Sequence, residues 1–273
     1  MNYQCPLCFK PLRLLNNNWQ CEDKHQFDRA KEGYVNLLPV QHKRSKDPGD
    51  SAEMMQSRRQ FLNAGHYDSM RKLAAEKLNQ YLAKESDTVL DIGCGEGYYT
   101  DYFMQDIRKQ HQSISFFGLD VSKAAIRYAA KRYSSVNFCV ASSHRLPFFQ
   151  DSIGAIIRIY APCKAEELSR VLQPAGILIT VTPAPRHLQE LKRLIYSEVK
   201  LHPIKEEELP QFTLLDETNL NYSMQLTGNE AFELLQMTPF AWRASEDVKQ
   251  ALKQAALTDY TADFMIRVYQ LND

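Results

Sequence analysis

Three cysteines and one histidine near the N-terminus have the residue types and the spacing of a metal site. Cys5 and Cys8 form a C-x2-C pair, and Cys21 and His25 complete the pattern C-x2-C-x12-C-x3-H. Zinc takes four thiolate or imidazole ligands in a tetrahedron, and two short-range pairs joined by a hairpin supply them. A segment of about 35 residues buries little apolar surface, so the metal would supply folding energy. Chance cysteines beside a surface histidine are the alternative, and this spacing favours zinc.

A second candidate binding site is a run of glycines at every second position, Gly93, Gly95 and Gly97. The apolar residues 89–92 before it are typical of a buried parallel strand, and residues 96–109 after it favour a helix. A strand, a glycine turn and a helix let the backbone approach a ligand and direct free N–H groups toward it. The dinucleotide spacing G-x-G-x-x-G and the P-loop are both absent. The sequence therefore predicts a different nucleotide-like ligand.

Alternating strands and helices must position these residues. The expected strands cover residues 89–92, 115–119, 136–141, 152–159 and 177–181, and the expected helices cover 67–83, 96–109, 121–133, 166–172 and 186–200. This alternation predicts a doubly wound parallel sheet. Two later strands, 221–226 and 261–270, flank a helical region at 229–236 and can add an antiparallel edge. We therefore expect an α/β fold with a mostly parallel seven-stranded sheet and a small N-terminal zinc-binding domain.

A polar segment separates the two parts. Residues 41–50 are polar, and Pro48-Gly49 interrupts regular structure there. The basic cluster at 42–46, with Arg58 and Arg59 beyond it, is typical of a solvated linker and less often of a phosphate-contacting strip. We predict a zinc-binding module at residues 1–36, a linker at 37–59 and the α/β domain at 60–273.

The composition narrows the class of protein. The chain has 273 residues, 44% hydrophobic and 24% charged, which is ordinary for a soluble globular protein. No apolar run approaches a membrane span, and the N-terminus lacks a signal pattern, so we expect a cytoplasmic protein without a membrane partner. The formal net charge is zero, so any nucleic acid must be bound by local basic patches. Three of the six cysteines lie in the first 21 residues, which favours a metal site over disulfides.

Polar residues follow the expected strands at their carboxyl ends, where open α/β sheets bind ligands. Asp120 ends the second expected strand, and its carboxylate could accept both hydroxyls of a ribose. Ser142 and Ser143 follow the third strand, where an adenine edge would lie. Tyr160-Ala161-Pro162 follows the fourth strand, where residues that contact an acceptor are expected.

These motifs resemble those of class I S-adenosylmethionine-dependent methyltransferases. Residues 89–97 resemble their first motif, 117–122 the second and 141–148 the third, and residues 167–176 resemble the segment before strand five. Ser142 stands where the third motif usually has Asp, which leaves the adenine contact less defined. The resemblance spans about residues 60–200. It implies a Rossmann-like fold and S-adenosylmethionine as cofactor, and it does not specify the acceptor.

The zinc spacing narrows the resemblance further. Together with Gly65-His66-Tyr67-Asp68 and the segment 182–188, it resembles the bacterial 23S ribosomal RNA guanine-N1-methyltransferases. The resemblance implies that Cys5, Cys8, Cys21 and His25 bind Zn²⁺. It also implies that Tyr67 and His187-Leu188 close over the cofactor, although Tyr67 alone is typical of a core residue at a helix start. The cofactor-binding set is then Tyr67, Asp91, Gly93, Cys94, Gly95, Gly97, Tyr99, Thr100, Asp120, Ser142, His187 and Leu188.

The implied reaction is methyl transfer to N1 of a guanine in 23S ribosomal RNA by an enzyme that forms a homodimer. Guanine N1 carries a proton that must leave, and no residue is an evident base; residues 160–162 and His187 are candidates. Basic residues at Lys43, Arg58 and Arg186 would contact phosphates. Two alternatives stay open: a small-molecule methyltransferase with a structural zinc module, and a non-catalytic RNA-binding protein that retains the cofactor fold.

Overall fold

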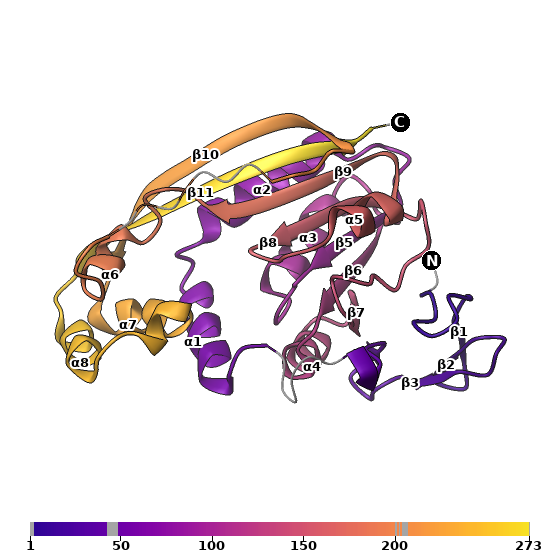
Figure 1. Ribbon diagram of the computed structural model, residues 1–273, viewed down its shortest axis with the longest axis horizontal. Helices are drawn as coiled ribbons and strands as arrows, with labels where there is room; N and C mark the ends of the chain where they lie inside the picture. Colours follow the sequence, from indigo (N-terminus) through magenta and orange to yellow (C-terminus); the bar gives the residue numbers. More distant parts are fainter. Residues whose placement is uncertain (1–2, 43–48, 200, 202, 204–206, 273) are drawn as a thin grey trace.

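A computed structural model describes residues 3–42, 49–199, 201, 203 and 207–272 (Figure 1). A small three-stranded sheet near the N-terminus lies at one end of the molecule, and helices α6 to α8 lie at the other. Between them is an eight-stranded sheet. Among the described residues, no helix is both long and apolar enough to cross a membrane.

The large sheet has the strand order β10-β11-β9-β8-β5-β6-β7-β4. Its strands are β4 (Val35–Asn36), β5 (Thr88–Ile92), β6 (Ser115–Asp120), β7 (Asn137–Val140), β8 (Ile153–Ile159), β9 (Leu172–Pro183), β10 (Phe212–Leu226) and β11 (Thr258–Leu271). Neighbours from β4 to β9 are parallel, whereas β11 is antiparallel to both β9 and β10. The expected α/β sheet with an antiparallel edge is confirmed. The strand β4 is an unexpected eighth member.

The core lies on both faces of this sheet. Val89 and Ile157 belong to one buried cluster, and their neighbours Leu90 and Ile156 belong to the other. Successive strand residues point to opposite faces, so two covered faces require the continuous apolar runs seen in β5 and β8. The edge strand β10 instead alternates exposed and partly buried residues along much of its length.

The helices are α1 (Ala52–Asn63), α2 (Asp68–Tyr81), α3 (Tyr98–Ile107), α4 (Lys123–Arg132), α5 (Ala165–Val171), α6 (Gln189–Arg193), α7 (Gly228–Gln236) and α8 (Glu246–Gln254), with short 3₁₀ turns at Val40–His42 and Pro239–Trp242. The prediction of a helix at 186–200 was wrong in extent. Helix α6 begins only after Leu188, because the backbone of Leu188 is left-handed, with a φ of 54°. Helices α1 and α8 were not expected. Both begin at a serine whose side chain accepts a backbone N–H three residues later.

The N-terminal segment packs directly on the large sheet. Its strands β1 (Arg13–Leu15), β2 (Asn18–Gln20) and β3 (Gln26–Asp28) form the small sheet, and β4 then pairs with β7. The Tyr3 ring lies edge-on to Phe117 at 5.6 Å. The domain bounds 1–36, 37–59 and 60–273 stay a prediction, with β4 inside the main sheet and most of α1 within the predicted linker.

Candidate active site and metal centre

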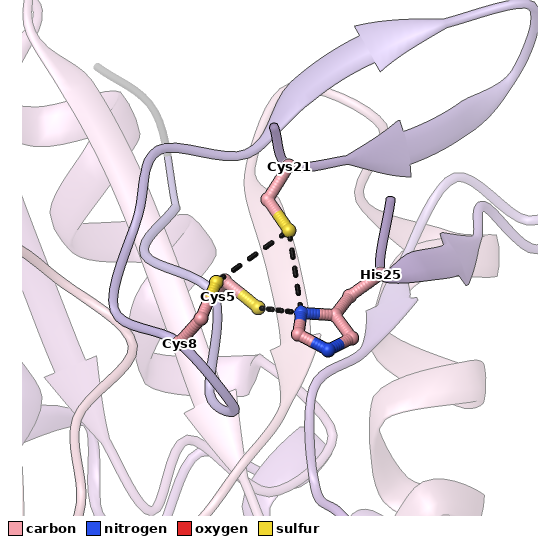
Figure 2. A group of neighbouring side chains, drawn as sticks. All are labelled: Cys5, Cys8, Cys21 and His25. Carbon is pink, nitrogen blue, oxygen red and sulfur yellow. Dashed lines mark hydrogen bonds between the residues drawn. The ribbon is translucent and has the colours of Figure 1, made fainter. Parts of the chain in front are cut away.

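The four predicted zinc ligands converge in the N-terminal segment (Figure 2). Their ligand atoms all lie within 4.8 Å of one another. Cys5 Sγ lies 3.6 Å and Cys21 Sγ lies 3.4 Å from Nδ1 of His25, and the sulfurs of Cys8 and Cys21 are 3.6 Å apart. A zinc tetrahedron with Zn–S bonds of about 2.3 Å has edges of roughly 3.5–3.8 Å. The donor set and its spacing therefore fit a zinc ion.

Two tight turns bring these ligands together. In the first, Phe9 N–H donates to Cys5 O, and in the second, Lys24 N–H donates to Cys21 O. Phe9 and Lys24 both have positive φ, at 63° and 64°. This conformation is unusual for such residues and persists only where the surroundings impose it. The backbone thus presents two ligand pairs from two similar turns.

The glycine turn lies at the carboxyl end of β5, beside the corresponding ends of β6 and β8. Gly93, Gly95 and Gly97 all have positive φ. A Cβ on Gly93 would lie 2.5 Å from the Cβ of Ala161, and one on Gly97 would press on Phe138 at 3.0 Å. A Cβ on Gly95 would meet no atom within 4 Å. Gly95 therefore faces open space, as a turn that admits a cofactor requires.

Two carboxylates flank the turn. Asp120 accepts hydrogen bonds from Gly95 N–H at 3.0 Å and from Ser122 N–H at 2.8 Å, so it fixes the turn from the end of β6. Each carboxylate oxygen retains a further lone pair that could accept a ribose hydroxyl. Asp91 is buried in β5 and accepts a hydrogen bond of 2.6 Å from the Thr100 hydroxyl. Burial raises the pKa of the Asp91 carboxyl to about 7, against the opposing effect of the Thr100 hydrogen bond.

Helix α1 carries Arg58 and Arg59, which the sequence indicated as basic residues of a linker and not as partners of the glycine turn. Arg59 donates to both oxygens of Glu96, inside the glycine turn, at 2.7 and 2.6 Å. Arg58 pairs with Asp50 and donates to Met237 O. The serine at position 51, followed by an amphipathic run, is the signal from which this helix could have been predicted.

Apart from His187 and Leu188, the remaining predicted cofactor residues occupy three places. Cys94, Tyr99 and Thr100 belong to the glycine turn and the start of α3, and Ser142 follows β7, where its hydroxyl accepts from His144 N–H. Tyr67 is buried, with its ring edge-on to Phe61 and Phe264. These positions are compatible with cofactor binding, and the assignments stay predictions.

His187 and Leu188 lie between β9 and α6. His187 is buried, and its ring centroid is 6.2 Å from those of both Tyr67 and Tyr160. Its Nδ1 accepts a hydrogen bond from Asp263 N–H at 3.2 Å. Of the basic residues proposed for phosphates, Arg186 is exposed and Lys43 lies outside the described residues. The structure thus brings His187, Tyr67 and Tyr160 together.

In this strand order the glycine turn follows β5, and Asp120 lies at the end of the neighbouring strand β6. This arrangement defines a class I methyltransferase. Comparison with known proteins agrees. A family model described as "Methyltransferase domain" matches residues 83–242, and one described as "RlmA, N-terminal" matches residues 3–46.

Similar proteins identify the family. A 23S rRNA (guanine(748)-N(1))-methyltransferase of Streptomyces fradiae is 30% identical over 250 residues, which are 89% of this chain and 87% of that protein. Relatives from Micromonospora griseorubida and Bacillus subtilis (strain 168), named for the same class of enzyme, are 29% and 28% identical. They align with 94% and 97% of this chain and with 92% and 96% of their own lengths. The chain belongs to the family of 23S rRNA guanine-N1-methyltransferases.

Proposed function

We propose that this protein transfers a methyl group from S-adenosylmethionine to N1 of a guanine in 23S ribosomal RNA. The observation that carries the proposal is that the family relationship spans both the zinc module and the methyltransferase fold. The cofactors are S-adenosylmethionine and zinc, in keeping with the methyltransferase domain and the Cys-His cluster.

The glycine turn and its neighbours would hold the cofactor. Gly95 leaves open space beside the turn, and Asp120 would accept ribose hydroxyls while it fixes Gly95. Ser142 would lie at the adenine edge, and Tyr67, Tyr99 and the segment 187–188 would close the site. The sulfonium methyl of the bound cofactor is itself electrophilic. The protein must therefore position guanine N1 in line with it and exclude water.

The zinc module would hold part of the RNA fold close to this site. Cys5, Cys8, Cys21 and His25 would bind the metal, and the module packs against β7 through β4. A cavity of about 410 Å³ lies between the module, the end of α4 and the start of β7, and Arg29, Lys31 and Glu32 are among its lining residues. Cations in such a cleft would contact phosphates.

Transfer of label from S-adenosylmethionine to RNA tests the proposal. Total ribosomal RNA from a strain that lacks the protein is the substrate, and the modified base is mapped. We expect a single N1-methylguanine in 23S rRNA, and no label with a Gly95→Asp variant, whose side chain would occupy the open space. A small-molecule methyltransferase would instead turn over without RNA. A non-catalytic RNA-binding protein would bind cofactor and transfer nothing.

We further propose a cytoplasmic homodimer. The dimer rests on the family relationship. The cytoplasmic location follows from the proposed substrate, which also rests on that relationship. Light scattering coupled to size-exclusion chromatography should give twice the chain mass of 31.6 kDa. A monomer at assay concentration, with full activity, would contradict the dimer and leave the proposed reaction intact.

A further inference from the structure

Tyr160 lies beside the cofactor turn, on the side where the acceptor must arrive. Strand β8 pairs in parallel with β5, and Arg158 lies opposite Ile92. Tyr160 is two residues further along, level with the glycine turn. The contact between Ala161 and the Cβ position of Gly93 places the same segment against the turn. Tyr160 thus borders the glycine turn, next to the residue that packs on Gly93.

The backbone holds Tyr160 in an unusual conformation. Its φ is 57°, although it is a bulky residue, and its N–H donates to Val181 O at 3.1 Å. Such strain is concentrated at functional sites. The residue is 46% exposed, which is high for an aromatic side chain beside a buried sheet. The strained backbone therefore fixes where the ring and hydroxyl lie.

A chain of hydrogen bonds sets the direction of the Tyr160 hydroxyl. Asp263 N–H donates to Nδ1 of His187, so in the neutral imidazole the hydrogen is on Nε2. Nε2 lies 3.5 Å from the Tyr160 oxygen and donates to it. The hydroxyl hydrogen of Tyr160 then points away from His187. It can be donated to a ligand in front of the turn.

The hydroxyl is suited to donate a proton in a hydrogen bond and not to act as a base. Burial raises the pKa of Tyr160 well above its ordinary value, and the neighbouring hydroxyls of Tyr67, Tyr99 and Tyr222 raise it further. The neighbouring hydroxyls belong to Tyr67, which precedes α2, to Tyr99 of α3 and to Tyr222 of β10. Tyr160 keeps its hydrogen throughout the working pH range.

We propose that Tyr160 donates this hydrogen bond to O6 of the target guanine, and that His187 is its positioning residue. The inference rests on the proposed function. When the N1 proton passes to water, the negative charge is shared between N1 and O6. A hydrogen bond to O6 stabilises that anion in the manner of an oxyanion hole. The N1 lone pair forms the new N–C bond as the S–CH₃ bond breaks, and the sulfur leaves as a neutral thioether.

Tyr160→Phe is the direct test, because it keeps the ring and removes only the hydroxyl. With unmodified 23S rRNA and saturating cofactor we expect kcat to fall about 100-fold at neutral pH, the usual effect of losing one such donor. Affinity for S-adenosylmethionine should be unchanged. The deficit should shrink as pH rises, because alkali ionises guanine N1 without help. An unchanged kcat, or an equal deficit at every pH, would overturn the inference.

Two His187 variants separate positioning from packing. The amide of His187→Gln can still donate to Tyr160, whereas His187→Leu cannot. We expect His187→Gln to keep most of the kcat and His187→Leu to reproduce the pH profile of Tyr160→Phe. In the Tyr160→Phe background, His187→Leu should lower kcat no further; additive losses would refute the positioning role. If wild-type protein transfers no label to rRNA, the proposed function fails instead, so the two failures are distinguishable.

Discussion

Arg59 of α1 and Glu96 of the glycine turn form a two-pronged ion pair, with N–O distances of 2.7 and 2.6 Å. The Arg59 guanidinium also lies over the Tyr128 ring of α4, 4.6 Å from its centroid. The Glu96 side chain is only 15% exposed. Parallel N–H···O bonds of this kind fix orientation as well as distance. Helix α1 is therefore joined to the turn that would hold the cofactor.

We predict that Arg59→Gln weakens S-adenosylmethionine binding about fivefold. The pair is partly buried, and its coupling energy should be about 1 kcal/mol. Without it, Glu96 and the turn lose their anchor on α1. Isothermal titration calorimetry measures the affinity. Glu246→Gln, which breaks the exposed pair with Lys249 on α8, is the matched control and should change nothing. Equal affinities for all three proteins would mean that α1 has no part in cofactor binding.

Gly95 and Gly97 should respond differently to alanine, because their surroundings differ. Both have positive φ, which costs an alanine about 1–2 kcal/mol. A methyl on Gly97 would also press on Phe138 and Tyr133, both at 3.0 Å, whereas one on Gly95 would enter open space.

We therefore expect Gly97→Ala to lower the unfolding free energy by more than Gly95→Ala. Gly95→Ala should weaken cofactor binding at least tenfold, since its methyl occupies the cofactor's space. Urea unfolding and calorimetry measure the two effects. Unimpaired cofactor binding by Gly95→Ala would place the ligand elsewhere.

The sequence predicted the sheet well because its strands are marked by local patterns. Buried parallel strands such as β5 and β8 must be apolar on both faces, and this leaves continuous runs in the sequence. The metal cluster was equally predictable, since its four ligands lie within 21 residues of one another and zinc restricts their spacing. The structure brings those ligand atoms together as expected.

Features that depend on contacts between distant residues were not predictable. Helix α1 was assigned to a linker because basic residues and Pro48-Gly49 outweighed its weak amphipathic pattern. Its role depends on Glu96, 37 residues away. Strand β4 has only two residues, and it forms because the zinc module packs on β7. The left-handed conformation of Tyr160 likewise has no local signal, and its backbone N–H is bound by Val181 O of β9, 21 residues away.

Removal of zinc should affect RNA methylation and cofactor binding differently. We expect Cys21→Ser to lose the metal and to unfold the module, because structural zinc contributes about 10–16 kcal/mol and so small a segment has little other stability. RNA methylation should be lost, while S-adenosylmethionine still binds at the glycine turn. Metal analysis and calorimetry measure the two properties.

Glu22→Gln is the control for the zinc experiment, since it alters an exposed residue in the same loop. It should keep both zinc and activity. Full zinc content in Cys21→Ser would contradict the ligand assignment, and loss of cofactor binding would mean that the module also supports the turn.

Asp91 should make stability depend on pH. Burial raises its pKa to about 7, whereas an aspartate in the unfolded chain has a pKa of about 3.9. Between these values the folded protein retains a proton that the unfolded chain has released. The contribution of Asp91 to stability therefore falls as pH rises from about 4 to about 7, and is constant beyond.

Asp91→Asn removes this dependence, because the amide does not titrate. As pH rises from about 4 to about 7, wild type should lose stability relative to the variant. The difference in unfolding free energy between the two proteins should change by up to about 4 kcal/mol in favour of the variant. Thr100→Val removes the hydrogen bond that favours the charged form, so it should raise the pKa of Asp91 and extend the falling phase above pH 7. Urea unfolding across this range measures both. Curves for wild type and Asp91→Asn that run parallel at every pH would show that the Asp91 carboxyl titrates alike in the folded and unfolded chain.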